Sequence, residues 1–155
     1  MTSSAINPND ILSIGKRVVA REAQALSALH LALGAEFTQT VQTILAAKGR
    51  VIVSGMGKSG HIARKIAATF ASTGTLAHYV HPAEASHGDL GMIGSDDVVM
   101  VLSNSGETAE LSDLLAHVAR FSIPMIGIAS RAGSTLLERA DVAFLMPQIP
   151  EACDL

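Results

Sequence analysis

Short apolar runs alternate with longer amphipathic stretches over most of this chain. Five short, mostly apolar runs are flanked by Gly or polar residues, which is typical of buried strands. They lie at residues 51–53, 76–80, 98–102, 125–129 and 142–145. Stretches with helical spacing separate them, at 59–72, about 108–121 and from 134 onward, whereas 81–97 is predicted to be a loop. This alternation predicts a five-stranded parallel sheet with helices on both faces, a three-layer α/β/α fold with right-handed crossovers.

Two further helices are predicted ahead of the sheet. Asn7-Pro8-Asn9-Asp10 is typical of a helix start, with a capping side chain followed by Pro at the first helical position. The long helix that follows is expected to end at Gly34, and a second helix to stop at Gly49. Because these helices have more apolar surface than a terminal extension needs, we interpret them as partly an oligomer interface; the alternative is that they only cap the sheet.

Composition and charge narrow the class of protein. A chain of 155 residues is long enough for one domain, 1–155, and 48% hydrophobic residues with only 3% aromatic predict an aliphatic core. The formal charge is −3 and the Lys and Arg residues are scattered along the chain. The sequence therefore has no basic stripe that would follow a phosphodiester backbone, and nucleic acid is not an expected partner.

Cysteine usage and apolar run length bear on the compartment. The single cysteine, Cys153, excludes an intramolecular disulfide framework and fits a reducing cytoplasm. The first ten residues contain no apolar signal-peptide core, and unbroken apolar runs reach only five residues. We therefore expect neither a signal peptide nor a membrane span, and a cytoplasmic protein.

The most informative segment follows the apolar run at 98–102. Ser103-Asn104-Ser105-Gly106-Glu107-Thr108 places three hydroxyls and an amide where the next predicted helix begins. Hydroxyl donors and free backbone N–H groups at a helix start form a site for a phosphate group, helped by the helix dipole. A second Ser- and Gly-rich turn, Ser54 to Gly60, follows the run at 51–53. Two such turns predict one phosphorylated ligand held from two sides.

The second turn also satisfies two nucleotide-binding patterns in part. Gly55-Met56-Gly57-Lys58-Ser59-Gly60 matches G-x-G-x-x-G after a strand, but a dinucleotide site needs an acidic residue at the end of the next strand. That strand ends at Val80-His81, and the first carboxylate after it is Glu84. A Walker A loop is excluded because Ile52 stands where its first glycine belongs. A site for a phosphorylated ligand, which both turns support, is the stronger interpretation.

The two turns resemble those of the sugar isomerase (SIS) domain, and the resemblance covers nearly the whole chain. Ser-x-Ser-Gly-x-Thr at 103–108 is specific to SIS domains in general. The Gly-Met-Gly-Lys-Ser-Gly-His segment at 55–61, His-Gly-Asp-Leu-Gly at 87–91 and Glu-Ala-Cys at 151–153 are similar to D-arabinose 5-phosphate isomerases. These enzymes start 3-deoxy-D-manno-octulosonate synthesis for lipopolysaccharide. The resemblance implies a flavodoxin-like fold and interconversion of D-ribulose 5-phosphate and D-arabinose 5-phosphate through an enediolate.

The resemblance also assigns roles to residues. It implies Lys58, Glu110 and Glu151 as catalytic residues by their matching positions, and His87 is a further candidate for proton relay or hydroxyl binding. The expected phosphate-binding residues come from both turns: Gly57, Ser59, Ser103, Asn104, Ser105 and Thr108. No cofactor is implied, and a homotetramer is expected because the resembling enzymes are tetramers. The competing hypothesis is a non-catalytic phosphosugar-binding or regulatory domain that keeps the phosphate site without turnover.

Simpler interpretations stand beside these roles. Carboxylates such as Glu107 and Glu110 are favoured in the first turn of a helix by its dipole alone, and Ser103 and Ser105 can serve as caps. Lys58 can be a solvated loop lysine. His81, Glu84 and His87 lie close enough in sequence for a metal site, although members of this family need no metal.

The chain departs from the family at its C-terminal end. Members continue into a helix that completes the fold and carries another catalytic histidine, and most then add a pair of CBS modules. Asp154 and Leu76 each stand where the family usually has proline. We therefore expect one face of the sheet to be uncovered and Glu151 to lie in a terminus that frays.

Overall fold

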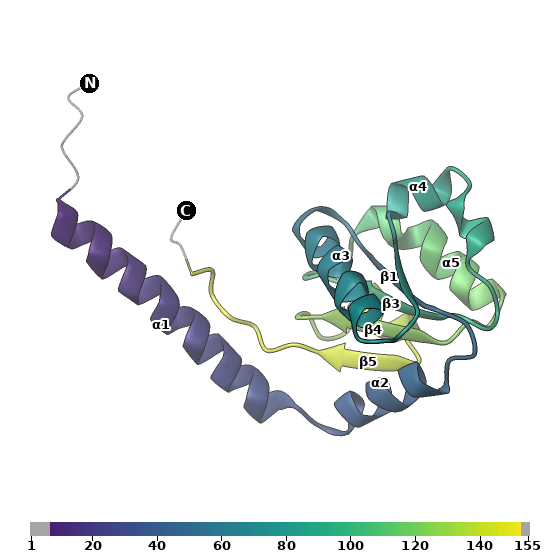
Figure 1. The fold of residues 1–155 in the computed structure, drawn as a ribbon, viewed down its shortest axis with the longest axis horizontal. Coiled ribbons are helices and arrows are strands. Elements are labelled where there is room, and N and C mark those ends of the chain that lie inside the picture. The colour runs from purple at the N-terminus through teal and green to yellow at the C-terminus, as the bar shows by residue number, and fades with distance from the viewer. Residues whose placement is uncertain (1–6, 153–155) are drawn as a thin grey trace. The chain divides into compact units, whose positions relative to one another are not determined.

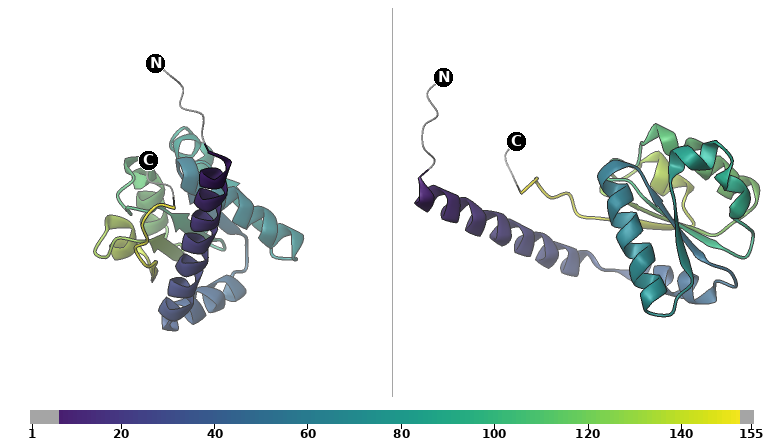
Figure 2. Two further views of the ribbon diagram at one scale, coloured as in Figure 1. Left: turned by 90° about the vertical axis from the view of Figure 1, so that its left-hand side faces the viewer. Right: turned by 45° about the horizontal axis from the view of Figure 1, so that its top comes forward.

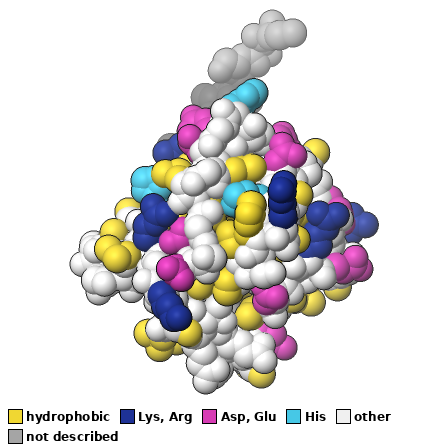
Figure 3. Space-filling model, turned by 90° about the vertical axis from the view of Figure 1, so that its right-hand side faces the viewer, with side chains coloured by type: hydrophobic (Ala, Val, Ile, Leu, Met, Phe, Trp, Pro, Cys, Tyr) yellow, Lys and Arg dark blue, Asp and Glu magenta, His cyan; other side chains and the backbone are white. Residues whose placement is uncertain are grey.

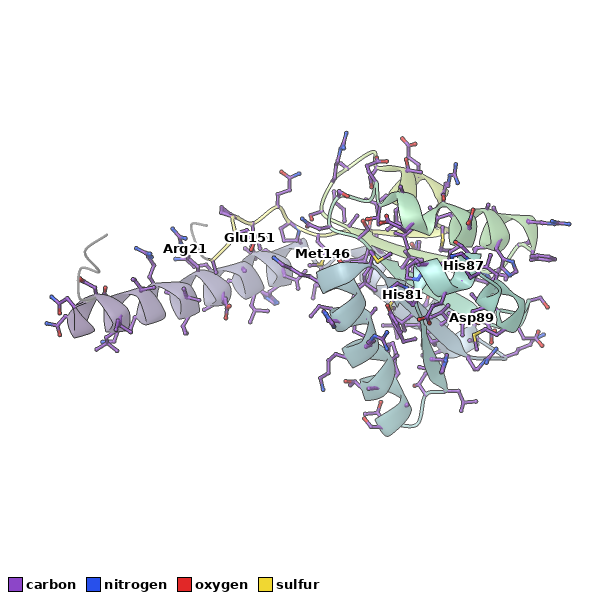
Figure 4. All side chains as sticks on the ribbon, turned by 90° about the horizontal axis from the view of Figure 1, so that it is seen from above. Arg21, His81, His87, Asp89, Met146 and Glu151 are labelled. Carbon is purple, nitrogen blue, oxygen red and sulfur yellow. The ribbon has the colours of Figure 1, made fainter. Side chains whose placement is uncertain are left out.

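The computed structural model describes residues 7–152 and divides into two compact units. The helix unit combines the chain up to Leu33 with the residues from Pro147 onward, and the sheet unit comprises Gly34–Met146. Met146, which Figure 4 labels, is therefore the last residue of the sheet unit. Cys153 and Asp154 lie outside the described residues.

The helix unit contains the predicted N-terminal helix, α1 (Pro8–Ala32). The start is as expected, because the Asn7 side chain accepts a hydrogen bond of 3.0 Å from the backbone N–H of Asn9. At the other end the helix ends at Ala32 with Leu33 as its C-cap, and Gly34 is the N-cap of the next helix rather than the terminator of this one. Large apolar side chains along α1 are exposed: Ile11, Leu12, Ile14, Val19, Leu26 and Leu31.

The sheet unit is built on five parallel strands, which confirms the predicted fold class (Figure 1). The strands are β1 (Val51–Gly55), β2 (Ala77–Val80), β3 (Val98–Leu102), β4 (Met125–Ala129) and β5 (Val142–Leu145). They lie side by side in the order β2-β1-β3-β4-β5, which is the flavodoxin-like order. All residues of β1 and β3 are buried, because these strands have neighbours on both edges and helices on both faces.

Helices cover both faces of this sheet, as the ribbon views in Figures 1 and 2 show, so the expectation that one face is uncovered is wrong. α2 (Ala35–Ala46) and α3 (Gly57–Ser72) pack on one face, where Ile44, Ala63 and Ala67 meet the strands. The other face holds α4 (Pro82–Ser86), the 3₁₀ helices η1 (Asp89–Met92) and η2 (Ala109–Leu111), α5 (Ser112–Arg120) and α6 (Thr135–Arg139). The core between these layers is almost wholly aliphatic, as the composition indicates.

Two segments differ from the sequence prediction. The predicted loop after β2 contains α4 and η1, because the His81 ring caps α4 by accepting from the N–H of Ala83 at 3.3 Å, and Pro82 follows at the first helical position. The helix predicted from about 108 to 121 begins as the 3₁₀ helix η2, and the α-helix starts only at Ser112. The polar turn therefore leads into η2 and not directly into an α-helix.

The surface adds two observations. None of the helices within residues 7–152 combines the length and apolar character that a membrane crossing requires. On the face shown in Figure 3, basic, acidic and apolar side chains are interspersed rather than sorted into a basic stripe. This mixture is consistent with the scattered charges of the sequence.

Candidate functional site

The two polar turns begin side by side at one edge of the sheet. β1 and β3 pair in register from Val51 with Val98 to Gly55 with Leu102, so that both strands end at the same level. β2, which follows β1 in sequence, lies on the other side of β1. The turns therefore flank the point where the strand order reverses, which is where ligands bind in sheets of this type.

The turn at 54–60, which follows β1, brings the start of α3 close to the strand ends. A Cβ atom at Gly55 would lie 2.9 Å from the carbonyl oxygen of Leu102 and 3.0 Å from the carbonyl carbon of Ser59, so only glycine permits this approach. Lys58 is exposed and Ser59 half-buried in the first turn of this 16-residue helix. The free N–H groups of such a turn and the lysine ammonium both favour an anion.

The turn at 103–108, which follows β3, is held together by hydrogen bonds of its own hydroxyl groups. The buried Ser103 places its Oγ 2.8 Å from Oγ1 of Thr108 and accepts a 3.0 Å hydrogen bond from the N–H of Gly106. Ser105 Oγ accepts from the N–H of Glu107 at 3.2 Å. The predicted phosphate residues Ser103, Ser105 and Thr108 are thus gathered in one tight turn, with Ser105 exposed and Thr108 half-buried.

Asn104 of the same turn is tied to the loop after β4. Its carbonyl oxygen accepts 3.0 Å hydrogen bonds from both the N–H and the hydroxyl of Ser130. The Ser130 hydroxyl also contacts the side-chain oxygen of Asn104. Asn104 itself is exposed.

Glu107 has a different role from the one that the sequence indicates. The helix-dipole interpretation assigns it to the helix that follows, but its carboxylate accepts from Thr135 Oγ1 at 2.7 Å and from the N–H of Thr135 at 3.1 Å, at the start of α6. These bonds, first from the hydroxyl and then from the N–H, hold the pKa of Glu107 below its ordinary value, and the nearby Arg131 acts in the same direction. The carboxylate is therefore held in its charged form on the α6 side of the turn.

Glu110 and His87 belong to neighbouring elements. Glu110 is exposed in η2, and α4 packs against both η2 and α5. His87 is the exposed C-cap of α4, and Figure 4 shows His81, His87 and Asp89 around this short helix and the turn after it. The loop that follows β2 thus comes next to the residues that follow β3.

Glu151 is in the helix unit rather than in the sheet unit. The Arg21 guanidinium donates to the backbone carbonyls of Glu151, at 3.5 Å, and Ala152, at 3.1 Å, and Figure 4 labels Arg21 and Glu151 on neighbouring segments. Of the four predicted catalytic residues, Lys58, His87 and Glu110 therefore belong to the sheet unit, and Glu151 does not.

The structure also bears on the alternative of a metal site. Within residues 7–152, His, Cys, Asp and Glu side chains nowhere gather in a group of three or more that could hold a metal ion. His81, Glu84 and His87 accordingly do not form a ligand set, and the His81 ring is used instead to cap α4.

The sequence did not reveal how the side chains of Tyr79 and Ser54 support the turn at 54–60. The Tyr79 hydroxyl donates a 3.0 Å hydrogen bond to the carbonyl oxygen of Gly55, and the Arg64 guanidinium lies 4.1 Å from the centre of its ring. Burial raises the pKa of Tyr79 despite this cation. The buried Ser54 hydroxyl donates to the carbonyl oxygen of Val80 at 2.8 Å. The feature of the sequence that could have identified Tyr79 and Ser54 is a polar group near the end of each of two predicted strands.

A doubly wound parallel sheet with polar turns at its switch point defines a ligand-binding α/β domain. The chain belongs to the SIS domain family, whose model matches residues 44–154. Arabinose 5-phosphate isomerase KdsD of Pseudomonas aeruginosa is 47% identical over 146 residues, which are 94% of this chain and 45% of that protein. Uncharacterized protein RP505 of Rickettsia prowazekii is 46% identical over 147 residues, 95% of this chain and 46% of that protein.

The fold comparison agrees with the sequence comparison. Protein c3406 of E. coli CFT073, solved in complex with A5P, superposes with a TM-score of 0.91 and 38% identity, over 96% of this chain and 79% of that one. The chain spans a little less than half the length of the curated relatives. The resemblance drawn from the sequence motifs, to SIS domains and their arabinose 5-phosphate isomerase branch, is confirmed.

Proposed function

We propose that this chain binds a pentose 5-phosphate and interconverts D-ribulose 5-phosphate and D-arabinose 5-phosphate, a step toward 3-deoxy-D-manno-octulosonate and lipopolysaccharide. The observation that carries the proposal is the in-register pair of turns at the switch point, one opening α3 and the other lined with hydroxyls. The relative named as an arabinose 5-phosphate isomerase and the structural neighbour in complex with A5P support the choice of ligand.

In this proposal the phosphate lies between the two turns. Gly57 and Ser59 supply the N–H groups and hydroxyl of the α3 start, and Ser103, Asn104, Ser105 and Thr108 supply donors from the other side. A dianion gains from each such charge-assisted hydrogen bond and from the positive end of the helix dipole. The sugar then extends over the turn that holds Glu110 and toward α4.

The isomerisation moves one proton between neighbouring carbons. A base removes the proton from the carbon beside the carbonyl, the electron pair forms the C=C bond of an enediolate, and the carbonyl oxygen gains the negative charge. The proton is then returned to the other carbon, so the reaction is redox-neutral and no redox cofactor is needed. We assign Glu110 as the base, Lys58 as the cation that stabilises the enediolate and His87 as the residue that relays protons between the oxygens. The role of second carboxylate that the resemblance implies for Glu151 stays a prediction.

Calorimetric titration tests the ligand site. We expect arabinose 5-phosphate to bind the wild-type chain, and Ser105→Ala and Thr108→Val each to weaken binding by about tenfold, the effect of losing one hydrogen bond to a charged group. Ser72→Ala is the matched control, because Ser72 ends α3 at the far side from the turn. Unphosphorylated arabinose should not bind measurably. Unchanged affinity in both turn variants would contradict this site.

Glu110→Gln tests the chemistry. The amide keeps the shape and hydrogen-bonding capacity of the side chain but cannot accept a carbon-bound proton, so turnover should fall by about 10² to 10⁴ while affinity is retained. Interconversion of the two pentose phosphates is followed by NMR, with Glu138→Gln, an exposed carboxylate on α6, as control. Near-normal turnover in Glu110→Gln would assign the base elsewhere. Binding without turnover in the wild type would favour the non-catalytic phosphosugar-binding domain.

A further inference from the structure

The turn between Ser103 and Thr108, called here the phosphate turn, is attached to the segment 128–136 along its length. The N–H of Ser103 donates to the carbonyl oxygen of Ile128, and the N–H of Leu136 donates to the carbonyl oxygen of Gly106, both at 3.0 Å. Ser130 binds Asn104 from the same segment. The backbone of the phosphate turn is therefore fixed by a part of the chain that contributes none of the predicted ligand residues.

One of these attachments involves a charge inside the phosphate turn itself. Glu107 stands between Gly106 and Thr108, and both carboxylate oxygens accept hydrogen bonds from Thr135, at 3.1 Å and 2.7 Å. Glu107 and Thr135 line a pocket of about 200 Å³ between η2 and α6. A carboxylate so close in sequence to a phosphate site would repel a dianion if its side chain were free to turn toward it.

The contact also reaches a predicted ligand residue. The N–H of Glu107 donates to Ser105 Oγ at 3.2 Å, so the position of Glu107 affects where the Ser105 hydroxyl lies. Beneath the same turn, the fully buried Ser134 packs against Gly106. Holding Glu107 on Thr135 thus has two effects: it fixes the Ser105 oxygen, and it keeps a negative charge on the α6 side.

We propose that the Glu107–Thr135 pair makes phosphate binding possible by anchoring the phosphate turn and restraining its own negative charge, so that both are positioning residues. This inference rests on the proposed phosphosugar site and adds a requirement to it. The carboxylate becomes harmful to the ligand only when Thr135 no longer holds it. With an ordinary structural contact, the affinity for the phosphosugar would not depend on the charge of Glu107 in this way.

The test is a set of calorimetric titrations with arabinose 5-phosphate. Thr135→Val removes the 2.7 Å hydroxyl bond and leaves only the 3.1 Å bond from the N–H. The carboxylate is then held less firmly, so affinity should fall by about tenfold. Thr135→Ser retains the hydroxyl and should bind as the wild type does. Adding Glu107→Gln to Thr135→Val removes the charge and should recover the part of the affinity that was lost to repulsion. The loss in Thr135→Val should also shrink at high salt, because exposed charges are screened there.

The outcomes separate the two levels of the proposal. Glu138→Gln on α6 is the charge control and should bind normally. If the wild type binds but Thr135→Val binds equally well, or if the double variant is no better than Thr135→Val, the restraint on Glu107 is overturned and the phosphate site stands. If the wild type does not bind a phosphosugar, the site and this inference both fail. If Thr135→Val lost affinity because it failed to fold, Glu107→Gln would not restore binding, since removing a charge does not replace the missing hydroxyl. Recovery in the double variant therefore excludes a folding defect as the cause.

Discussion

At the scale of single residues, Arg50 and Asp97 form a charged pair joined by several hydrogen bonds. The nearly buried Asp97 accepts from the N–H and guanidinium of Arg50, at 2.7 Å and 3.0 Å, and from the N–H of Gly94 at 2.9 Å. Burial acts to raise the pKa of Asp97, but these hydrogen bonds outweigh it and the pKa lies below its ordinary value. The pair fastens the segment before β3 to the start of β1.

Asp97→Asn should therefore destabilise the protein in a pH-dependent way. A lowered pKa in the folded state stabilises the fold fully above the ordinary Asp pKa of about 3.9, and this contribution is lost as the pH falls through the lower folded value. At pH 7 the free energy of unfolding should fall by about 1.5–3 kcal/mol. Urea unfolding at pH 7 and pH 3 measures the difference, which should shrink at pH 3. Asp96→Asn, at an exposed position, is the control. An equal loss of unfolding free energy at pH 7 and pH 3 in Asp97→Asn would contradict this account.

At the scale of elements, Gly106 lets the phosphate turn pack closely against the residue that precedes α6. Gly106 has a positive φ of 69°, and a Cβ atom there would overlap Ser134 Oγ. Gly133, in the loop just before α6, has a similar φ of 67° but open space around it. The two glycines therefore share a backbone requirement and differ in their packing.

Substituting both glycines separates the two effects. Gly133→Ala should lower the free energy of unfolding by about 1–2 kcal/mol, the cost of a left-handed conformation for a residue with a Cβ. Gly106→Ala should cost roughly 1–3 kcal/mol more, because the added methyl must displace the buried Ser134. Chemical denaturation of the two variants gives the comparison directly. Equal losses would mean that the contact with Ser134 relaxes without effect.

The sequence predicted the strands better than the polar contacts. Val98–Leu102 and Val142–Leu145 match because apolar runs between polar turns depend only on local pattern. The partner of Glu107 was missed because Thr135 lies beyond β4, and nothing local to Glu107 indicates it. The short α4 was predicted as loop although His81-Pro82 is a helix-start pattern, since its five residues are too few to show helical periodicity.

At the scale of the whole molecule, the exposed apolar residues of α1 indicate that this helix binds a partner. Leu12, Val19, Leu26 and Leu31 are 60%, 66%, 68% and 84% exposed. Monomeric proteins rarely present so much apolar surface on one element. We therefore propose that α1 contributes to a homo-oligomeric interface, with a homotetramer as the expected assembly.

Light scattering at micromolar concentration tests this assembly. The wild type should have the mass of an oligomer, and Leu26→Asp should reduce it, because a buried unpaired charge is costly at an interface. Ser27→Asp places the same charge on an exposed neighbouring position of α1 and should leave the mass unchanged. A monomeric mass for the wild type would contradict the proposal.

The strand order has a consequence for how the sheet unit forms during synthesis. β1 must pair with β3, and the chain between them contains α3, β2, α4 and η1. The centre of the sheet therefore closes only after the ribosome has released residues well beyond β1, and folding should be governed by this long-range closure. Until then the unpaired backbone N–H and C=O groups on the edge of β1 that later meets β3 are open to pairing with other nascent chains.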